Sequence, residues 1–279
     1  MTSQSHTRGA AHKSTGPNLT LELALLGVLA TLWSSSYAFI KIGVETIPPV
    51  TLIAWRSLLA GLLLWGVMAL RGVRMPFEAA LWRRFLLQAC VNSVIPFTLI
   101  AWAEKTVDAA LATILNSTSP IFTFLITWAI TRHEAVTARK LVGVVAGIAG
   151  IVLIVGLEAL GSAGRHLLAQ VALVVATIAF AVASVIGRGF RGLDPIVPAA
   201  GSLLGGAVLL LPASLLFEQP WTAAPSARSL GAMAALAVFS SGMGVVIYFR
   251  LLNTLGSVGT TAQAYLRVPI GVAIGVLFL

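Results

Sequence analysis

Nine stretches of predominantly apolar residues follow one another along almost the whole sequence. They restrict the possible fold more than any other feature. A helix needs about 20 such residues to cross roughly 30 Å of hydrocarbon. None of the stretches shows the sustained alternation of a membrane β-strand, so the sequence predicts an all-α integral membrane protein. The predicted spans are 23–44, 50–70, 85–102, 109–130, 141–157, 167–187, 197–217, 230–252 and 258–279.

Charged residues are few and unevenly placed. They make up 10% of the chain, whereas a soluble domain has about a quarter. A net charge of +9 would suggest a nucleic-acid partner in a soluble protein. Here the Lys and Arg residues gather in alternate loops, which is the positive-inside pattern of a membrane protein. We therefore expect a lipid bilayer around the chain, no nucleic-acid partner and a cytoplasmic N-terminus in a bacterial inner membrane. The basic residues expected inside are Arg8, Lys13, Arg71, Arg74, Arg83, Arg84, Arg132, Arg139, Lys140, Arg188, Arg191 and Arg250, and those expected outside are Lys41, Lys105, Arg165 and Arg228.

The sequence contains few residues that carry reaction chemistry. It has one cysteine, Cys90, and four scattered histidines, so we expect neither a metal site nor a cofactor. It lacks HExxH, GxxxxGK and a carboxylate pair at the membrane midplane, and we expect no enzyme. Proton coupling normally requires an intramembrane carboxylate or histidine. Glu22, Glu104 and Asp108 are all expected at helix ends, so the sequence gives proton coupling no support.

A weak internal repeat divides the chain. The segment NSTSPI at 116–121 resembles YLRVPI at 265–270, which places Pro120 and Pro269 at an offset of 149 residues. The first repeat contains five predicted spans. Because five is an odd number, the second repeat enters the membrane from the opposite side. Inverted repeats of this kind support alternating access in transporters. We expect a disordered cytoplasmic tail over 1–20, a first repeat over 21–160 and an inverted second repeat over 161–279.

Several short motifs carry a resemblance to a known family. They are WSSSY at 33–37, Lys41, the proline pair 48–49, Arg56, AWAEKT at 101–106 and SPI at 119–121. Together these resemble the first four helices of EamA-type transporters in the drug/metabolite transporter superfamily. The resemblance implies a bundle of five plus five helices with both termini cytoplasmic. The sequence stops at Leu279, where the family has a short loop and a tenth helix. We therefore expect nine helices here, with the tenth missing from a truncated sequence.

The resemblance also implies a function. It indicates a secondary transporter, most simply an exporter of small organic metabolites such as amino acids or drugs. One alternative is an exchanger of anionic or phosphorylated metabolites, with Arg267, Lys41 and Arg56 as anion contacts. Another is a membrane scaffold or enzyme without transport. The expected partner is a small-molecule substrate, and a homodimer is left open.

Prolines near the middle of three spans indicate candidate substrate contacts. Proline lacks an N–H, so Pro96 frees the carbonyl of Asn92 and Pro120 that of Asn116. Pro269 does the same for Tyr265. Free carbonyls at membrane depth must be buried in protein or face a water-filled cavity. The alternative is helix packing through small polar residues, which we weigh equally for the serines beside the two asparagines, Ser93 and Ser117.

Arg267 is the most informative single residue. It lies about 13 Å into the last span at 1.5 Å per residue, where an arginine costs about 2.5–3.5 kcal/mol on insertion scales. We expect it to face the bundle interior and to bind a substrate carboxylate or proline-freed carbonyls, with a structural role as the alternative. Arg56 and Lys41 lie nearer span ends and are expected to reach the interface. The predicted substrate-binding residues are Trp33, Asn92, Pro96, Asn116, Ser119, Pro120, Tyr265 and Arg267.

Glycine spacing predicts two close helix contacts. Gly143 and Gly147 form a GxxxG pattern in the fifth span, and Gly201 and Gly205 repeat it in the seventh. Small residues at this spacing allow helix backbones to approach closely.

Overall fold

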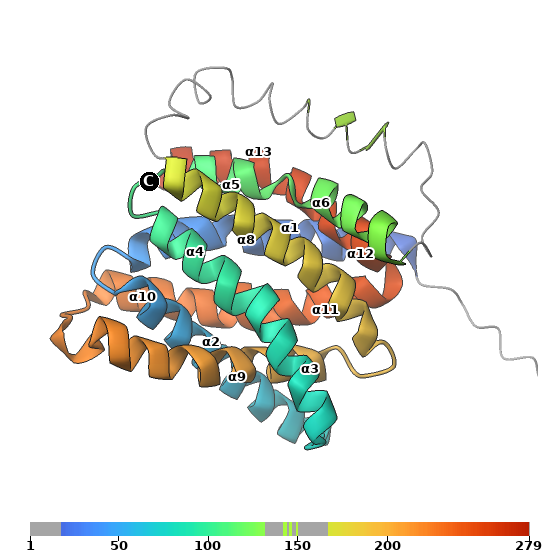
Figure 1. Cartoon of the computed structure of the whole chain (residues 1–279), viewed down its shortest axis with the longest axis horizontal. Helices are drawn as coiled ribbons and strands as arrows, with labels where there is room; N and C mark the ends of the chain where they lie inside the picture. The colour runs from blue at the N-terminus through green and yellow to red at the C-terminus, as the bar shows by residue number, and fades with distance from the viewer. Residues whose placement is uncertain (1–17, 132–141, 144, 147–148, 150–166, 279) are drawn as a thin grey trace, which may run out of the picture.

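A computed structural model of the chain describes residues 18–131, 142–143, 145–146, 149 and 167–278. Within these residues the fold is all-helical, and Figure 1 shows the helices packed side by side in one bundle. Six helical segments are long and apolar enough to cross a membrane, which confirms an integral membrane protein. They are Leu19–Gly43, Pro49–Leu70, Ala79–Ala103, Leu167–Phe190, Ile196–Glu218 and Ala227–Thr254.

The first two spans are continuous helices. Helix α1 (Leu19–Gly43) begins at Asn18, whose side chain accepts hydrogen bonds from the backbone N–H groups of Thr20 and Leu21. This is the usual role of Asn as an N-cap. The helix therefore starts inside the tail expected over 1–20, and residues 1–17 lie outside the described part. Helix α2 (Pro49–Leu70) begins with proline at its first position, where the missing N–H has no helical partner to lose.

Two other spans contain a π-helical segment in the middle. The third comprises α3 (Ala79–Ala89), a π segment (Cys90–Val94) and α4 (Ile95–Ala103). The eighth comprises α10 (Ala227–Ala235), a π segment (Leu236–Met243) and α11 (Gly244–Thr254). In the first case Pro96 follows directly and cannot donate a backbone hydrogen bond. Short π segments of this kind are frequent at functional sites.

The predicted spans 109–130 and 258–279 are interrupted. The former consists of α5 (Ala109–Asn116), a turn and α6 (Ser119–Ile126), followed by a π segment (Thr127–Thr131). The latter consists of α12 (Gly256–Thr261) and α13 (Gln263–Phe278). Pro120 restarts the helix after the first break. Pro269 lies within α13, so the second break precedes it at Ala262.

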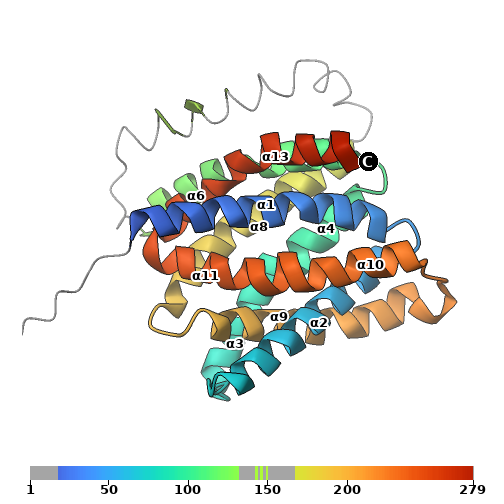
Figure 2. The same cartoon turned by 180° about the vertical axis from the view of Figure 1, so that it is seen from behind.

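The remaining helices complete the bundle. They are α8 (Leu167–Gly187), a 3-10 turn (Arg188–Phe190), α9 (Ile196–Ala213), a π segment (Ser214–Glu218) and a second 3-10 turn (Pro220–Thr222). The predicted span 141–157 lies mostly outside the described residues. Figure 2 shows α1 between α13 on one side and α10 and α11 on the other, while α2 lies along α9.

Carboxylates fix the two ends of the α2–α9 pair. At one end both oxygens of Glu218 accept backbone N–H groups of Val50 and Thr51, at 3.0 and 2.7 Å. A carboxylate at a helix N-terminus also interacts favourably with the helix dipole. At the other end Arg71 forms an ion pair of 3.3 Å with Asp194.

Glycine brings α3 and α9 together as expected, whereas the contact predicted for Gly143 and Gly147 stays a prediction, because Gly147 and most of that span lie outside the described residues. A Cβ at Gly201 would lie 2.5 Å from the Phe85 ring, and one at Gly205 would lie 3.3 Å from Leu86. Nothing described lies within 4 Å of a Cβ added at Gly143. A GxxxG pattern permits close packing, but only the neighbouring helix decides whether the contact forms.

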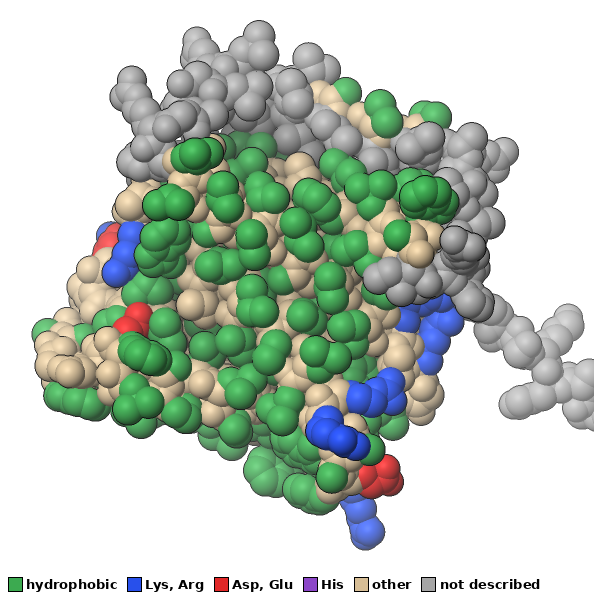
Figure 3. Space-filling view, in the orientation of Figure 1, with side chains coloured by type: hydrophobic (Ala, Val, Ile, Leu, Met, Phe, Trp, Pro, Cys, Tyr) green, Lys and Arg blue, Asp and Glu red, His purple; other side chains and the backbone are tan. Residues whose placement is uncertain are grey.

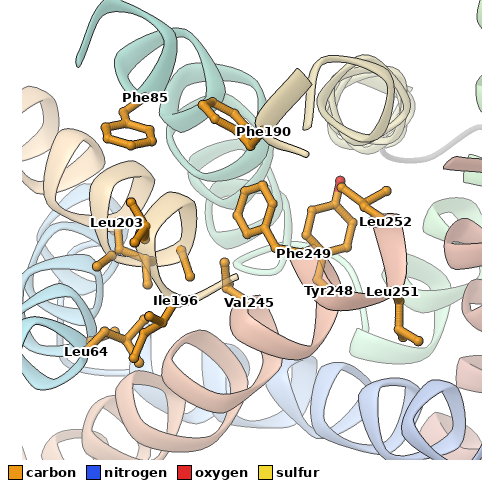
Figure 4. Close-up of a cluster of buried hydrophobic side chains, with 14 of the residues drawn as sticks. Leu64, Phe85, Phe190, Ile196, Leu203, Val245, Tyr248, Phe249, Leu251 and Leu252 are labelled. Atoms are coloured by element: carbon orange, nitrogen blue, oxygen red, sulfur yellow. The ribbon is translucent and has the colours of Figure 1, made fainter. Parts of the chain in front are cut away.

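Two apolar clusters form the core, and one of them contains a row of aromatic rings. Figure 4 shows Phe85, Phe190, Phe249 and Tyr248 next to one another in this order in space. Their successive ring centroids are 5.4, 5.9 and 5.4 Å apart. The outer surface is also apolar. In Figure 3 one face is covered with hydrophobic side chains, and charged side chains lie towards its opposite ends. This is the distribution that a lipid-facing surface requires.

Candidate functional site

Arg267 lies at the centre of the bundle and faces inward. Only 5% of the residue is exposed. Its Nε donates to Gln263 at 2.6 Å, one turn earlier on α13. Its Nη1 donates to Oδ1 of Asn116 at 3.2 Å and to the hydroxyl of Tyr37 at 3.4 Å. No ion pair is found between Arg267 and a carboxylate in the described part of the chain. The positive charge is therefore held by neutral groups from three helices.

Trp33 forms the adjoining wall. The guanidinium carbon of Arg267 lies 4.8 Å from the centroid of the Trp33 ring, within the range of a cation–π interaction. The indole N–H donates to the carbonyl of Ser240 at 3.0 Å, and the ring packs on Tyr248 at 5.3 Å. Beside it, the hydroxyl of Ser34 donates to the backbone carbonyl of Arg267 at 2.9 Å. These contacts fix α1 against α13 and against the π segment of the eighth span.

A small cavity lies between these side chains. Its volume is about 10 Å³, close to the space that one water molecule needs. An amino acid or a larger metabolite does not fit, so substrate binding requires the helices around the cavity to separate. The lining residues are Trp33, Asn92, Ser119, Phe180, Tyr248, Thr261, Gln263 and Arg267.

Several buried polar atoms at or beside the cavity have no hydrogen-bond partner among the residues that the structure describes. They include Oδ1 of Asn92, Nδ2 of Asn116 and the hydroxyl of Tyr248. Asn92 is 4% exposed and Asn116 is 1% exposed. A buried polar group without a hydrogen bond costs about 1–3 kcal/mol. Such groups beside a cavity are available to a polar ligand.

The structure brings together most, but not all, of the predicted site residues. Trp33, Asn92, Ser119 and Arg267 line the cavity, and Asn116 reaches it through Arg267. Pro96 and Pro120 are buried next to these residues and shape the helices rather than line the cavity. Tyr265 is only partly buried and is not a lining residue, because its position on α13 differs from that of Arg267 by two residues. Pro269 is exposed.

Four lining residues are missing from the predicted set. Gln263 shares the face of Arg267 because the two residues are four apart on one helix, so this contact had a signal in the sequence. Phe180, Tyr248 and Thr261 come from other helices. Their approach depends on how α8, α11 and α12 pack, which no local pattern encodes.

The serines near the site mostly bond to nearby backbone. Ser35 and Ser36 donate to the carbonyls of Leu32 and Trp33. Ser117 donates to the carbonyl of Ile114 at 2.5 Å. Such bonds satisfy a hydroxyl within its own helix, and they favour the structural interpretation of Ser117.

Arg56 is placed differently from the prediction, because it does not reach an interface. It is 1% exposed, and its guanidinium carbon lies 3.7 Å from the centroid of the Phe97 ring. Its Nε and Nη1 have no hydrogen-bond partner among the described residues. Glu104 lies at a helix end, directly after α4, as expected, and its side chain is completely buried there. Lys41 donates to the backbone carbonyls of Glu104 and Val107, so its ammonium group has protein partners.

The sequence is similar to known membrane transporters. Residues 21–156 match the EamA-like transporter family. The chain is 28% identical over 258 residues to the uncharacterized inner membrane transporter YedA of Escherichia coli K12, covering 91% of this chain and 82% of that protein. It is 30% identical over 257 residues to an uncharacterized transporter of Archaeoglobus fulgidus, covering 90% and 86%. The uncharacterized transporter YoaV of Bacillus subtilis is 22% identical over 249 residues, covering 88% and 85%.

The fold is also similar to that of a solved protein. A crystal structure matches with a TM-score of 0.71 and 21% sequence identity, covering 93% of this chain and 90% of the other. At this identity the match indicates a shared arrangement of helices.

Proposed function

The chain belongs to the EamA-like transporter family, and on this basis we propose that it is a secondary transporter that exports small organic molecules carrying a carboxylate, such as amino acids. The observation that carries the substrate class is Arg267. It is a buried guanidinium that no carboxylate in the described residues neutralises, and it lies beside a cavity. A carboxylate ligand would neutralise it and form charge-assisted hydrogen bonds.

Alternating access between two inverted repeats, 21–160 and 161–279, is the proposed mechanism. The helix contacts support it, because each contact in one half has a counterpart in the other. Helix α1 packs against α10 and α11, and α8 packs against α3 and α4. Helix α1 packs against α13, and α8 packs against α5 and α6. Helix α5 contacts α13 while α6 contacts α12, which is an antiparallel crossing.

The two π segments add support for the repeat. Cys90–Val94 and Leu236–Met243 lie in the third and eighth spans. Asn92 and Ser93 in one correspond to Ser240 and Ser241 in the other at an offset of 148 residues, close to the offset of the two prolines. These segments provide irregular helix geometry next to the cavity, where inverted-repeat transporters bind substrate.

The small cavity represents an occluded state in this proposal. The aromatic row from Phe85 to Tyr248 ends at the cavity, because Tyr248 is a lining residue. Opening towards either side requires the α5–α6 and α12–α13 segments to move against their neighbours. Both segments are interrupted helices, and such breaks provide hinge points at which two halves can change angle.

The membrane orientation and the partners are part of the same proposal. The twelve-to-four distribution of basic residues supports a cytoplasmic N-terminus. The lipid bilayer and a small-molecule substrate are the proposed partners, and the basic loops serve topology rather than nucleic-acid binding.

A second candidate is the transport of anionic or phosphorylated metabolites. The observation that favours it is Arg56, a second buried guanidinium that has no hydrogen-bond partner in the described residues. Phe97 separates it from the cavity, since Phe97 packs on the cavity residue Phe180 at 5.3 Å. A substrate with two anionic groups would use both arginines.

A transport screen in reconstituted vesicles tests these proposals. Radiolabelled amino acids, dicarboxylates, sugar phosphates and cationic drugs are compared in vesicles with wild-type protein, with Arg267→Ala and with Arg56→Gln. Amino-acid transport that depends on Arg267 alone supports the first candidate. Transport of doubly anionic compounds that depends on both arginines supports the second. Transport of cationic drugs only, unchanged by Arg267→Ala, would contradict both.

A further inference from the structure

A glutamate is buried where the third span ends. Glu104 directly follows α4 and opens the turn 104–108 that leads to α5. None of its surface is exposed. Ala103, directly before it, and Val107, three residues after it, belong to an apolar cluster that also contains Tyr37 and Ile40 of α1. The carboxyl group thus lies in an apolar setting at one end of the bundle.

Neither oxygen of this carboxyl group has a hydrogen-bond partner within the described part of the chain. The contrast with Glu22, the other buried acidic residue there, is clear. Glu22 accepts from Arg250 at 2.8 Å and from Thr254 at 3.0 Å. Glu22 is therefore held as a paired carboxylate. Among the described residues, Glu104 lacks the hydrogen bonds that stabilise the negative charge of Glu22.

The ammonium group of Lys41 binds backbone carbonyl groups of the turn that contains Glu104. Lys41 donates to the carbonyl oxygen of Glu104 at 2.6 Å and to that of Val107 at 3.2 Å. These bonds fix the turn 104–108 on the last turn of α1. The ammonium group lies within electrostatic range of the Glu104 carboxyl group, but the ion pairs found in the described part of the chain do not include these two groups.

The other groups that face Glu104 connect it to the cavity. Tyr37 lies one helical turn before Lys41 and within electrostatic range of Glu104. Its hydroxyl accepts from Arg267. Lys105 and Asp108 belong to the same turn, but their side chains are exposed. Tyr37 therefore links Glu104 to Arg267 of the proposed substrate site, and a conformational change of the turn 104–108 can affect Arg267 through Tyr37.

We propose that Glu104 is a proton-binding site of the transport cycle, occupied while the turn 104–108 is closed on α1 and emptied when the turn opens. An ionised carboxylate buried without hydrogen bonds is strongly unfavourable, so the group takes up a proton instead. In the closed state the carboxyl group is neutral. Opening the turn brings water to the group, which then releases its proton as H₃O⁺ and becomes a hydrated carboxylate near Lys41. Low pH therefore favours closure at this end of the bundle.

The role in transport rests on the function proposed above, but the proton itself is measured without any substrate. Infrared spectroscopy of the protein in liposomes near pH 7 detects the C=O stretch of protonated carboxyl groups. We expect such a band in the wild type and in Asp108→Asn, which removes an exposed carboxylate from the same turn. We expect its loss in Glu104→Gln. A wild-type spectrum without the band, or a band that persists in Glu104→Gln, would overturn the proposal.

A second measurement follows the turn directly. In a Cys90→Ser background, Val107→Cys places a thiol at a position that is 5% exposed in the closed state. Maleimide labelling should accelerate as pH rises and the turn opens. Thr106→Cys, which is exposed, corrects for the ordinary increase in thiolate with pH. Glu104→Gln should remove the remaining pH dependence and keep Val107→Cys protected. An unchanged pH profile in Glu104→Gln would contradict the link between protonation and closure. If labelling follows the prediction but the vesicles transport nothing, the proposed function fails and the proton site stands.

Discussion

Nη1 of Arg267 lies 3.2 Å from Oδ1 of Asn116, and this contact joins the two interrupted helical segments of the bundle. Asn116 is the last residue of α5, directly before the helix break. Arg267 lies one turn into α13, which begins directly after the other break, at Ala262. The contact therefore connects two segments in which the helix is interrupted. A ligand that binds Arg267 in place of Asn116 would change how the segments are held together.

Replacing Arg267 by alanine should reduce transport about 10- to 100-fold, because a hydrogen bond to a charged group contributes about 1.5–3 kcal/mol. The protein should remain inserted and folded, since the substitution removes a costly charge from the membrane interior. Uptake in vesicles and size-exclusion profiles in detergent measure the two effects. Arg228→Ala, at an exposed position on α10, is the control and should transport normally. Normal transport by Arg267→Ala would exclude the proposed site.

Replacing Asn92 by leucine should separate function from stability. Oδ1 of Asn92 is buried and has no hydrogen-bond partner within the described residues, so removing it should leave the free energy of unfolding unchanged or raise it by about 1 kcal/mol. Transport should fall, because the polar group beside the cavity is lost. Thermal unfolding in detergent and vesicle transport measure the two quantities. A destabilised protein with normal transport would show that Asn92 has a packing role only.

Replacing Gly244 by alanine should disturb the cavity wall. The added Cβ would lie 2.7 Å from Nε1 of Trp33, so the indole must shift and its bond to the Ser240 carbonyl must weaken. Overpacking of this kind costs about 1–3 kcal/mol. We expect a lower unfolding temperature and a changed Trp fluorescence spectrum. Gly231→Ala, in the same span and with nothing within 4 Å, should behave like the wild type. Equal effects of the two substitutions would contradict the close contact.

Membrane orientation should follow the distribution of basic residues. In a Cys90→Ser background, Arg74→Cys should be labelled by an impermeant maleimide only after the membrane is opened, because the loop between α2 and α3 is expected in the cytoplasm. Thr106→Cys, in the turn after α4, should be labelled in intact cells. Labelling of the two positions in the reverse order would invert the proposed topology.

The sequence by itself determined the membrane class, the positions of most helices and the family. Apolar length predicts a span, because backbone groups in lipid must be satisfied within the helix. The same reasoning identified Arg267 as an interior residue, since a lipid-facing arginine is too costly. Trp33, Asn92, Asn116 and Ser119 were also recognised from local features such as small polar residues beside prolines. These are properties of single helices, and a single helix can be predicted from its own stretch of sequence.

How the helices meet depends on tertiary packing. Counting residues from a span end predicted that Arg56 reaches the interface, and it placed Glu104 at a helix end without indicating whether its side chain is buried. Both side chains are buried because neighbouring helices cover them, and the number of residues from a helix end does not report that cover. Gly143 and Gly201 share one sequence pattern. Gly201 has a neighbour, Phe85, at close range, whereas no such neighbour of Gly143 is found in the part of the chain that the structure describes. Phe180, Tyr248 and Thr261 reach the cavity from three different helices, because packing contacts between distant segments define a cavity.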